Sequence, residues 1–344
     1  MRRMPNTVFV TISRGAIARN ILQTAFLDRL VAAGADVVLI TPAAADPEFR
    51  AAFARPGVSF EPLLPHRWTR RDYFFSGLHK GLVYNETREL VDRYGIYGIE
   101  LYEKRPNHFK YLWKKAFFVP ASRSHLLKRA VRWLDNLLVK PKEYAELFDL
   151  RKPAVVFSTN PFEDADTDVL KTARAKGVPT VILPKSWDNL SKMNMRVRPD
   201  LLLLWGSTLV PDARRFHDMN EKNIRIVGVP QYDIYDEPGM VVSREEFFHT
   251  IGADPMRPLI VFGSEGKISP DDGDTAAILY GMLQALPVAG RPQLFLRPYY
   301  ALEGEEKKFA ALAGKDGVVI DTFFTPRLQF RDRWDWSREH ARHY

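Results

Sequence analysis

Polar and charged residues follow directly after several short apolar runs of this 344-residue chain, and chemistry is expected at those places. The clearest case is the segment 184–192, PKSWDNLSK, which follows the apolar run at 180–183. We predict Asp188 as the catalytic base, and Lys185, Trp187 and Asn189 as substrate-binding residues. The structural alternative is that Asp188 only caps a short helix.

A second segment, SRGA at 13–16, follows the first apolar run. Gly15 allows backbone amides to approach an anion and Arg14 adds positive charge, so both residues are predicted to bind substrate. The segment lacks the full G-x-G-x-x-G spacing of a dinucleotide site. A tight turn between a strand and a helix is the alternative.

Two further segments in the second half of the chain are suited to phosphate. In GSEGK at 263–267, a hydroxyl and glycines stand beside a lysine, which predicts Ser264, Gly266 and Lys267 as nucleotide- or phosphate-binding residues, although the spacing falls short of a Walker sequence. Arg297 ends an apolar run and is followed by proline, so it can grip a phosphate with two hydrogen bonds. A plain turn and a surface arginine are the respective alternatives.

Other chemistries are disfavoured by residue types. The chain has no cysteine, and its eight histidines have no metal-ligand spacing such as H-E-x-x-H. No G-x-S-x-G nucleophile elbow is present. We therefore expect no bound metal and no cofactor.

The elements that must position these residues alternate between strand and helix. Apolar β-branched runs at 7–13 and 36–41 flank a helical pattern at 17–33, which predicts a β-α-β unit with a parallel sheet. The alternation returns with strands at 154–158, 180–183, 201–205 and 224–229 and helices at 164–176 and 210–220. Open sheets of this kind bind ligands beyond the carboxyl ends of their strands, where the candidate residues lie.

A second α/β series begins after a polar linker at 230–240, with strands expected at 259–263, 293–297 and 318–321. The sequence thus predicts two Rossmann-like, doubly wound parallel-sheet domains, at 1–232 and 241–344. Three strands are about half of such a domain, so the second is expected to be incomplete.

The first domain is expected to contain a basic, helical insertion at about 85–148. An apolar stripe is formed by Leu127, Ala130, Val131, Leu134, Leu137 and Leu138. Charged residues such as Lys128, Arg129, Arg132 and Asp135 lie outside it. The pattern predicts a packed helix whose charged face meets solvent.

Composition limits the partners more than it names them. The formal net charge is +8, which favours anionic partners, but no nucleic-acid-binding motif is present. No run approaches the ~18 apolar residues of a membrane span, and the apolar stretch near the N-terminus is too short for a signal peptide. A cytoplasmic protein is expected.

The stretch 180–233 resembles bacterial surface-carbohydrate and CDP-glycerol glycerophosphotransferase-like proteins of the GT-B architecture. The matching pieces are SWDN at 186–189, the strand that ends in Trp205-Gly206, and VGVPQYD at 227–233, with a fainter likeness at Arg297-Pro298 and at 330–335. The resemblance implies a nucleotide-activated donor held by the second domain and a glycan or lipid-linked acceptor held by the first. This chain departs from the family by ending before the helix that commonly holds the donor diphosphate.

The resemblance implies transfer of a glycosyl or polyol-phosphate group to a surface glycan. Two alternatives remain open, a nucleotide-sugar epimerase of the same architecture and a nucleotide- or glycan-binding protein without catalysis. A lipid-linked acceptor would also give the basic insertion a use, because a helix with Trp113, Phe117 and Trp133 can lie on an anionic membrane.

Overall fold

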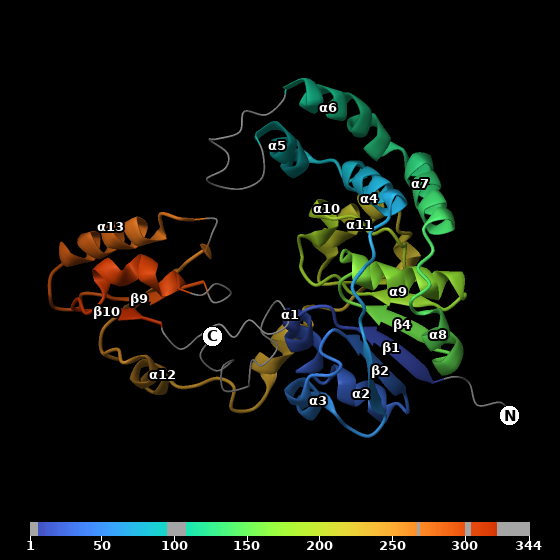
Figure 1. Cartoon of the computed structure of the whole chain (residues 1–344). Coiled ribbons are helices and arrows are strands. Elements are labelled where there is room, and N and C mark those ends of the chain that lie inside the picture. The colour runs from blue at the N-terminus through green and yellow to red at the C-terminus, as the bar shows by residue number, and fades with distance from the viewer. Residues whose placement is uncertain (1–5, 95–107, 267–268, 300–303, 322–344) are drawn as a thin grey trace. The chain divides into compact units, whose positions relative to one another are not determined.

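The computed structural model describes residues 6–94, 108–266, 269–299 and 304–321 of the chain (Figure 1). These residues divide into two compact units, one ending at Asp233 and the other beginning at Ile234.

The first unit is built on a parallel sheet with the strand order β3-β2-β1-β4-β5-β6-β7. The chain reverses its direction of growth between β1 and β4, as in a Rossmann fold. The strands are β1 (Thr7–Thr11), β2 (Asp36–Thr41), β3 (Val58–Pro62), β4 (Val155–Ser158), β5 (Thr180–Ile182), β6 (Leu201–Leu204) and β7 (Ile224–Ile226). The predicted fold class is confirmed, and β3 is an element that the apolar pattern did not predict.

Helices cover both faces of this sheet, which confirms the doubly wound arrangement. Phe9 of β1 meets Phe148 of α8 (Ala145–Arg151) edge to face at 5.0 Å, whereas Phe157 of β4 lies 4.9 Å from Phe26 of α2 (Phe26–Ala32) on the other face. The remaining helices around the sheet are α1 (Gly15–Ile17), α3 (Pro47–Phe53), α9 (Asp164–Ala175), α10 (Asn189–Lys192) and α11 (Val210–His217). Short turns follow at η3 (Ser207–Leu209) and η4 (Glu221–Asn223), and η5 (Pro230–Asp236) spans the boundary with the second unit.

The helix expected at 17–33 is interrupted. After α1 the chain forms a π-helical turn, η1 (Ala18–Leu22), and only then α2. The hydroxyl of Thr24 donates to the carbonyl of Ile21 at 2.7 Å and accepts from the amide of Phe26 at 3.2 Å. A side chain that bonds to the local backbone in this way competes with the helical ladder.

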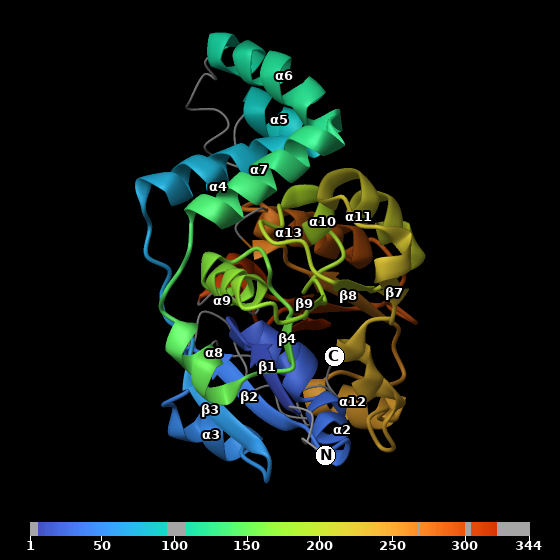
Figure 2. The ribbon, with the colours of Figure 1, turned by 90° about the vertical axis from the view of Figure 1, so that its right-hand side faces the viewer.

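Four helices are grouped beyond the sheet near α10 and α11 (Figure 2): α4 (Arg70–Leu82), α5 (Glu86–Tyr94), α6 (His108–Arg123) and α7 (His125–Leu138). The last three fall within the insertion predicted at about 85–148, whereas α4 precedes it, so the helical insertion begins earlier than predicted. Thr69 begins α4 with a reciprocal capping box to Asp72, and Ser124 caps α7. Gly81 allows α4 and α6 to approach closely, because a Cβ there would lie 2.1 Å from the ring of Phe118.

The orientation predicted for α7 is wrong. Lys128, Arg132 and Asp135 are buried, whereas Leu127 and Leu134 of the expected apolar stripe are more than one-third exposed. Of that stripe only Val131 is fully buried, in a small core formed with α4 and α6. The helix therefore turns its charged face toward the sheet domain and its apolar face outward.

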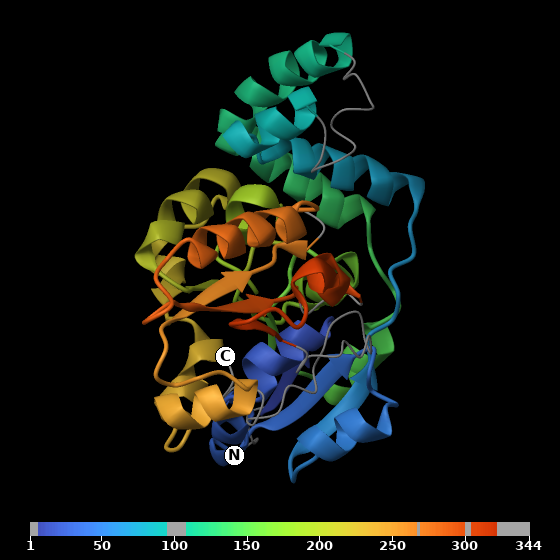
Figure 3. The ribbon, with the colours of Figure 1, turned by 90° about the vertical axis from the view of Figure 1, so that its left-hand side faces the viewer.

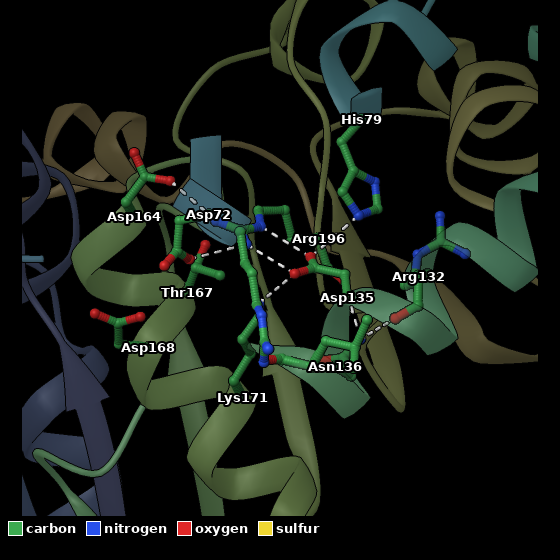
Figure 4. Close-up of polar contacts among 12 residues, drawn as sticks. Asp72, His79, Arg132, Asp135, Asn136, Asp164, Thr167, Asp168, Lys171 and Arg196 are labelled. Atoms are coloured by element: carbon green, nitrogen blue, oxygen red, sulfur yellow. Dashed lines mark hydrogen bonds and ion pairs between the residues drawn. The ribbon is translucent and has the colours of Figure 1, made fainter. Parts of the chain in front are cut away.

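Asp135 explains this orientation, because its carboxylate is completely buried among donors from three other elements (Figure 4). Arg196, which follows α10, donates to both oxygens at 2.8 and 2.9 Å, and Lys171 of α9 donates at 2.6 Å. His79 of α4 lies 3.1 Å away, and burial lowers the pKa of its imidazole. Although burial alone raises the pKa of Asp135, the hydrogen bonds of Arg196 and His79 outweigh it and hold the pKa far below the usual range.

A second buried carboxylate holds the other end of α7. Asp218 follows α11 in the left-handed conformation, with φ of 55°. Its carboxylate accepts from Arg132 at 3.1 Å and also contacts His125 and Lys128 of α7. The charged face of α7 is thus paired at both ends.

The second unit has a small parallel sheet with the strand order β10-β9-β8. Its strands are β8 (Leu259–Gly263), β9 (Gln293–Arg297) and β10 (Val318–Ile320), and its helical segments are α12 (Arg244–Ile251), α13 (Asp272–Gln284) and the 3₁₀ segment η7 (Glu305–Leu312). Leu294 and Leu296 pack into the core with α13 and η7, whereas Phe295 meets Phe247 of α12 on the opposite face. Figure 3 shows the ribbons of these helices beside the small sheet. Helices cover both faces here too.

No helix within the described ranges is long and apolar enough to cross a bilayer.

We predict that Asp135→Asn lowers the free energy of unfolding by about 3–5 kcal/mol, because it leaves two buried cations without their common counter-charge. Asp149→Asn is the matched control, since Asp149 is exposed and pairs with Lys176 at the surface, where such a pair contributes about 1 kcal/mol or less. Urea unfolding of the two variants measures the difference.

The same experiment has a defined pH dependence. The pKa of Asp135 is depressed in the folded protein, so its stabilising contribution is complete above the ordinary carboxyl pKa and is lost as the pH falls toward the folded value. The difference in the free energy of unfolding between wild type and Asp135→Asn therefore becomes smaller as the pH is lowered. Equal urea midpoints for the two Asp→Asn variants at neutral pH would contradict the role given to this carboxylate.

Candidate functional site

The carboxyl edge of the first sheet carries a cluster of polar groups around a fully buried acid. Asp166, on the first turn of α9, accepts hydrogen bonds from Thr11 at the end of β1 and from Ser158 at the end of β4, the latter at 3.1 Å. Burial raises the pKa of Asp166 to about 6, although the surrounding hydroxyls act in the opposite direction. This carboxyl can therefore change its protonation state near neutral pH.

Arg14 and Gly15 lie at the same edge, directly after β1. The guanidinium of Arg14 donates to Glu163, with Nε at 2.8 Å from the carboxylate, and Gly15 is buried at the start of α1. The charge of Arg14 is thus paired within the protein. A substrate anion at this position has to compete with Glu163.

The segment 184–192 forms a hydrogen-bonded loop that leads into α10. Asp188 accepts from the hydroxyl of Ser186 and from Nζ of Lys192, both at 2.7 Å, and Asn189 accepts from the amide of Ser186 at 3.1 Å. Partial burial alone raises the pKa of Asp188, but Lys192 and Ser186 outweigh it and lower the pKa. Asp188 is consequently ionised at neutral pH and is a weak base.

Trp187 and Lys185 face different surroundings. Trp187 is 68% exposed, so its ring is available to a ligand at the surface. Lys185 lines a cavity of about 10 Å³ at the sheet edge, with Thr159 and Trp205, a space that holds about one water. Within the described residues the Thr159 hydroxyl and the Trp205 indole N–H are buried without a hydrogen-bond partner.

The candidate residues of the second unit meet at the carboxyl end of its sheet, as expected. The amide of Ser264 donates to the carbonyl of Arg297 at 2.9 Å. Gly266 has φ of +66°, and a Cβ there would lie 2.7 Å from the ring of Tyr299, so glycine is required on two grounds. Lys267 lies outside the described residues, as does the segment 330–335.

Carboxylates share this edge with the candidate phosphate ligands. The hydroxyl of Ser264 donates to Asp272 at 2.6 Å, and Nε of Arg297 lies 3.4 Å from Asp321. Glu305 also approaches Ser264, at 3.4 Å. Lys308 stands among these acids as well, since its Nζ lies 2.8 Å from Glu305 and donates to the carbonyl of Gly266, so the edge presents mixed charge.

His66 forms a histidine–carboxylate pair that the sequence analysis did not single out. Its Nδ1 lies 2.7 Å from Asp168 of α9, and its Nε2 lies 3.6 Å from Asp72 of α4. Burial lowers the pKa of His66, but the hydrogen bond and charge of Asp168, together with Asp72, outweigh it and raise the pKa. An imidazole oriented by one carboxylate can take up or release a proton through its second nitrogen.

This pair borders a cavity of about 590 Å³ that has a basic rim. The rim is formed by Arg67, Arg70, Arg71, Lys140 and Lys142. A cavity of this size holds a small ligand, and its rim favours a phosphorylated one.

The missed residues left a signal in the sequence that was not used. Asp164, Asp166 and Asp168 alternate at the start of a predicted helix, where acids are commonly found because they are favoured at the positive end of the dipole. His66 follows β3, the strand that was not predicted. Among the described residues no group of three or more His, Asp or Glu is arranged to hold a metal ion.

No protein-family model matches the chain, and no curated protein matches it. Among solved structures, a glycosyltransferase from Rickettsia africae ESF-5 is 8% identical over 93% of this chain and 68% of its own, with a TM-score of 0.45. A UDP-N-acetylglucosamine 2-epimerase from Rickettsia bellii is 11% identical over 94% and 70%, with a TM-score of 0.41. The glycotransferase of kitacinnamycin is 13% identical over 92% and 71%, with a TM-score of 0.38. Similarities of this size say nothing about donor, acceptor or reaction.

We predict that Asp166→Asn stabilises the protein at neutral pH by about 1–3 kcal/mol relative to wild type, because it removes a buried charge while keeping the polar acceptor. The folded pKa is raised, so wild type loses stability as the pH rises from the ordinary carboxyl value through about 6. Urea unfolding at about pH 4 and about pH 7 measures the change. Asp149→Asn is the exposed control, and a difference that does not grow with pH would contradict the assignment.

Proposed function

We propose that this protein transfers a nucleotide-activated glycosyl or polyol-phosphate group to a glycan or lipid-linked acceptor. The observation that carries the proposal is the pair of parallel α/β sheets in one chain, each with polar and basic groups at its carboxyl edge. Open sheets bind their ligands at that edge. The resemblance of the stretch 180–233 to surface-carbohydrate transferases supports the same function.

In this proposal the second unit holds the donor. Arg297 and the loop at Ser264 and Gly266 would contact the diphosphate, since both follow strands at one end of the small sheet. Lys267 is proposed as a further phosphate ligand from the sequence alone. No metal or cofactor is proposed for the reaction.

The first unit would hold the acceptor, with Trp187, Lys185 and Asn189 as contacts and Arg14 and Gly15 near the same edge. Transfer to a hydroxyl requires removal of its proton, and the chain offers two groups for that step. Asp188 is ionised but paired with Lys192, whereas His66 is oriented by Asp168 and borders the larger cavity. A lipid-linked acceptor would place the protein at the inner face of the cytoplasmic membrane.

Donor binding is the first test. We predict that Arg297→Ala weakens binding of a nucleoside-diphosphate donor by about 1.5–3 kcal/mol, the scale of a hydrogen bond to a charged group. Lys315→Ala is the control, because Lys315 precedes β10 and so lies toward the amino end of the same sheet. Titration calorimetry measures both affinities, and a thermal melt checks folding. Equal affinities would remove Arg297 from the site, and failure of wild type to bind any nucleotide would count against the transferase.

Turnover is the second test. We predict that His66→Gln and Asp188→Asn reduce the transfer rate unequally. The variant that has lost the base for the acceptor hydroxyl is expected to be about 10²–10⁴-fold slower than wild type. His249→Gln is the control, because His249 is exposed in the second unit. The measurement is release of nucleotide with and without acceptor, as a function of pH. Nucleotide-sugar interconversion without acceptor would identify an epimerase, and binding without turnover would identify a non-catalytic protein.

A further inference from the structure

The outward face of α6 and α7 is apolar although the rest of the surface around it is basic. On α7, Leu126 is 78% exposed and Trp133 is 64% exposed, and Leu137 and Leu138 are also exposed. On α6, Phe109, Leu112, Trp113 and Phe117 recur at helical spacing and are exposed. We call these exposed apolar side chains of α6 and α7 the outer face. Large exposed apolar side chains that gather on two successive helices mark a candidate interaction site.

The outer face is not an accident of a poorly packed helix. The opposite side of α7 is held by Asp135 and Asp218, whose buried partners come from α9, from the segment after α10 and from α7 itself. Rotation of α7 to bury its leucines would bring Lys128, Arg132 and Asp135 out of these contacts. The ion pairs therefore hold the apolar side chains in solvent.

Charge indicates what the outer face meets. Between His108 and Lys142 the sequence contains nine Lys and Arg residues and a single acidic residue, Asp135. Asp135 is buried, and so are two of the nine cations, Lys128 and Arg132, which leaves seven Lys and Arg residues and no acid outside the buried network. A second copy of the chain would oppose this basic face with the same charges, which is unfavourable. An anionic lipid surface meets both requirements, since it accepts apolar and aromatic side chains and attracts Lys and Arg.

A separate observation gives a place for the lipid phosphate. Beside Trp133 lies a cavity of about 360 Å³ lined by Arg129, Arg132, Arg174 and Arg198, with asparagines and no acidic residue in its lining. The side chain of Arg132 is only 9% exposed, yet its Nε has no hydrogen-bond partner among the described residues. A guanidinium cluster of this kind suits a phosphate group.

We propose that the outer face docks on an anionic membrane, with Leu126, Trp113 and Trp133 entering the interface and a lipid phosphate bound in the four-arginine cavity. The inference adds a partner and a surface to the proposed transferase. It uses α6, α7 and the neighbouring Arg174 and Arg198, and none of the residues proposed to bind donor or acceptor, so membrane binding and sugar transfer can fail separately.

The full chain is tested by flotation with vesicles of phosphatidylcholine alone and of phosphatidylcholine mixed with phosphatidylglycerol, without any donor. Wild type is expected to bind the mixed vesicles and to lose binding as salt rises. Leu126→Glu is expected to weaken binding by at least about tenfold. Leu150→Glu is the matched control, because Leu150 of α8 is 77% exposed but lies off the outer face.

The cavity has its own variant. Arg174→Gln is expected to reduce affinity for the mixed vesicles about fivefold and to leave binding to phosphatidylcholine unchanged. Arg225→Gln is the control, because Arg225 of β7 is exposed and donates to the backbone carbonyls of Lys222 and Ile224. A shift of tryptophan fluorescence to shorter wavelength in wild type with the mixed vesicles reports insertion of the rings.

Three outcomes would overturn the proposal. The first is equal binding of Leu126→Glu and Leu150→Glu to the mixed vesicles. The second is that wild type does not bind vesicles but self-associates in sedimentation, and that Leu126→Glu abolishes the self-association. This result would assign the outer face to a second copy of the chain. The third is binding of soluble glycerol phosphate in an Arg174-dependent manner with no vesicle binding, which would make the cavity a site for a soluble anion.

Discussion

The buried carboxylate of Asp135 is the constraint on which the first unit depends. A charge removed from water requires partners, and those of Asp135 come from α4, α9 and the segment after α10. This side chain therefore joins the middle of α7 to the sheet domain, as Asp218 does for the other end of the helix. Replacing such a network by apolar residues is often neutral or stabilising in other proteins, so its value here lies in the specific position that it gives α7.

That position determines what the rest of the insertion can do. Because the charged side chains of α7 form buried ion pairs within the protein, its exposed leucines and Trp133 face outward, as do the exposed aromatic side chains of α6. Arg132, paired with Asp218, lies near Arg198 and Arg174, and burial together with the charges of these two arginines lowers the pKa of Arg132. The fold thus concentrates apolar surface and positive charge on one side of one element.

The sequence predicted the sheets well because their strands are continuous apolar runs bounded by turns. It predicted the ends of β8 and β9 to the residue, and it placed Ser264 and Arg297 at one end of the second sheet. It missed β3, VSFEP, because a half-buried edge strand alternates too little over five residues to stand out. It also missed His66, whose partner Asp168 is 102 residues away in the chain.

The error in α7 has a different cause. An amphipathic pattern separates an apolar face of a helix from a polar face. The usual assumption is then that the apolar face is the one that packs on the core. Here the decisive partners of Asp135, Lys171 and Arg196, lie 36 and 61 residues further along the chain, where no local pattern reveals them. A single acid among many cations on one helix is the only local hint, since an unpaired buried carboxylate would be prohibitively costly. Charges that are distant in the sequence therefore determine which face of such a helix turns toward the core, and its leucines remain exposed as a surface that the proposed membrane contact would cover.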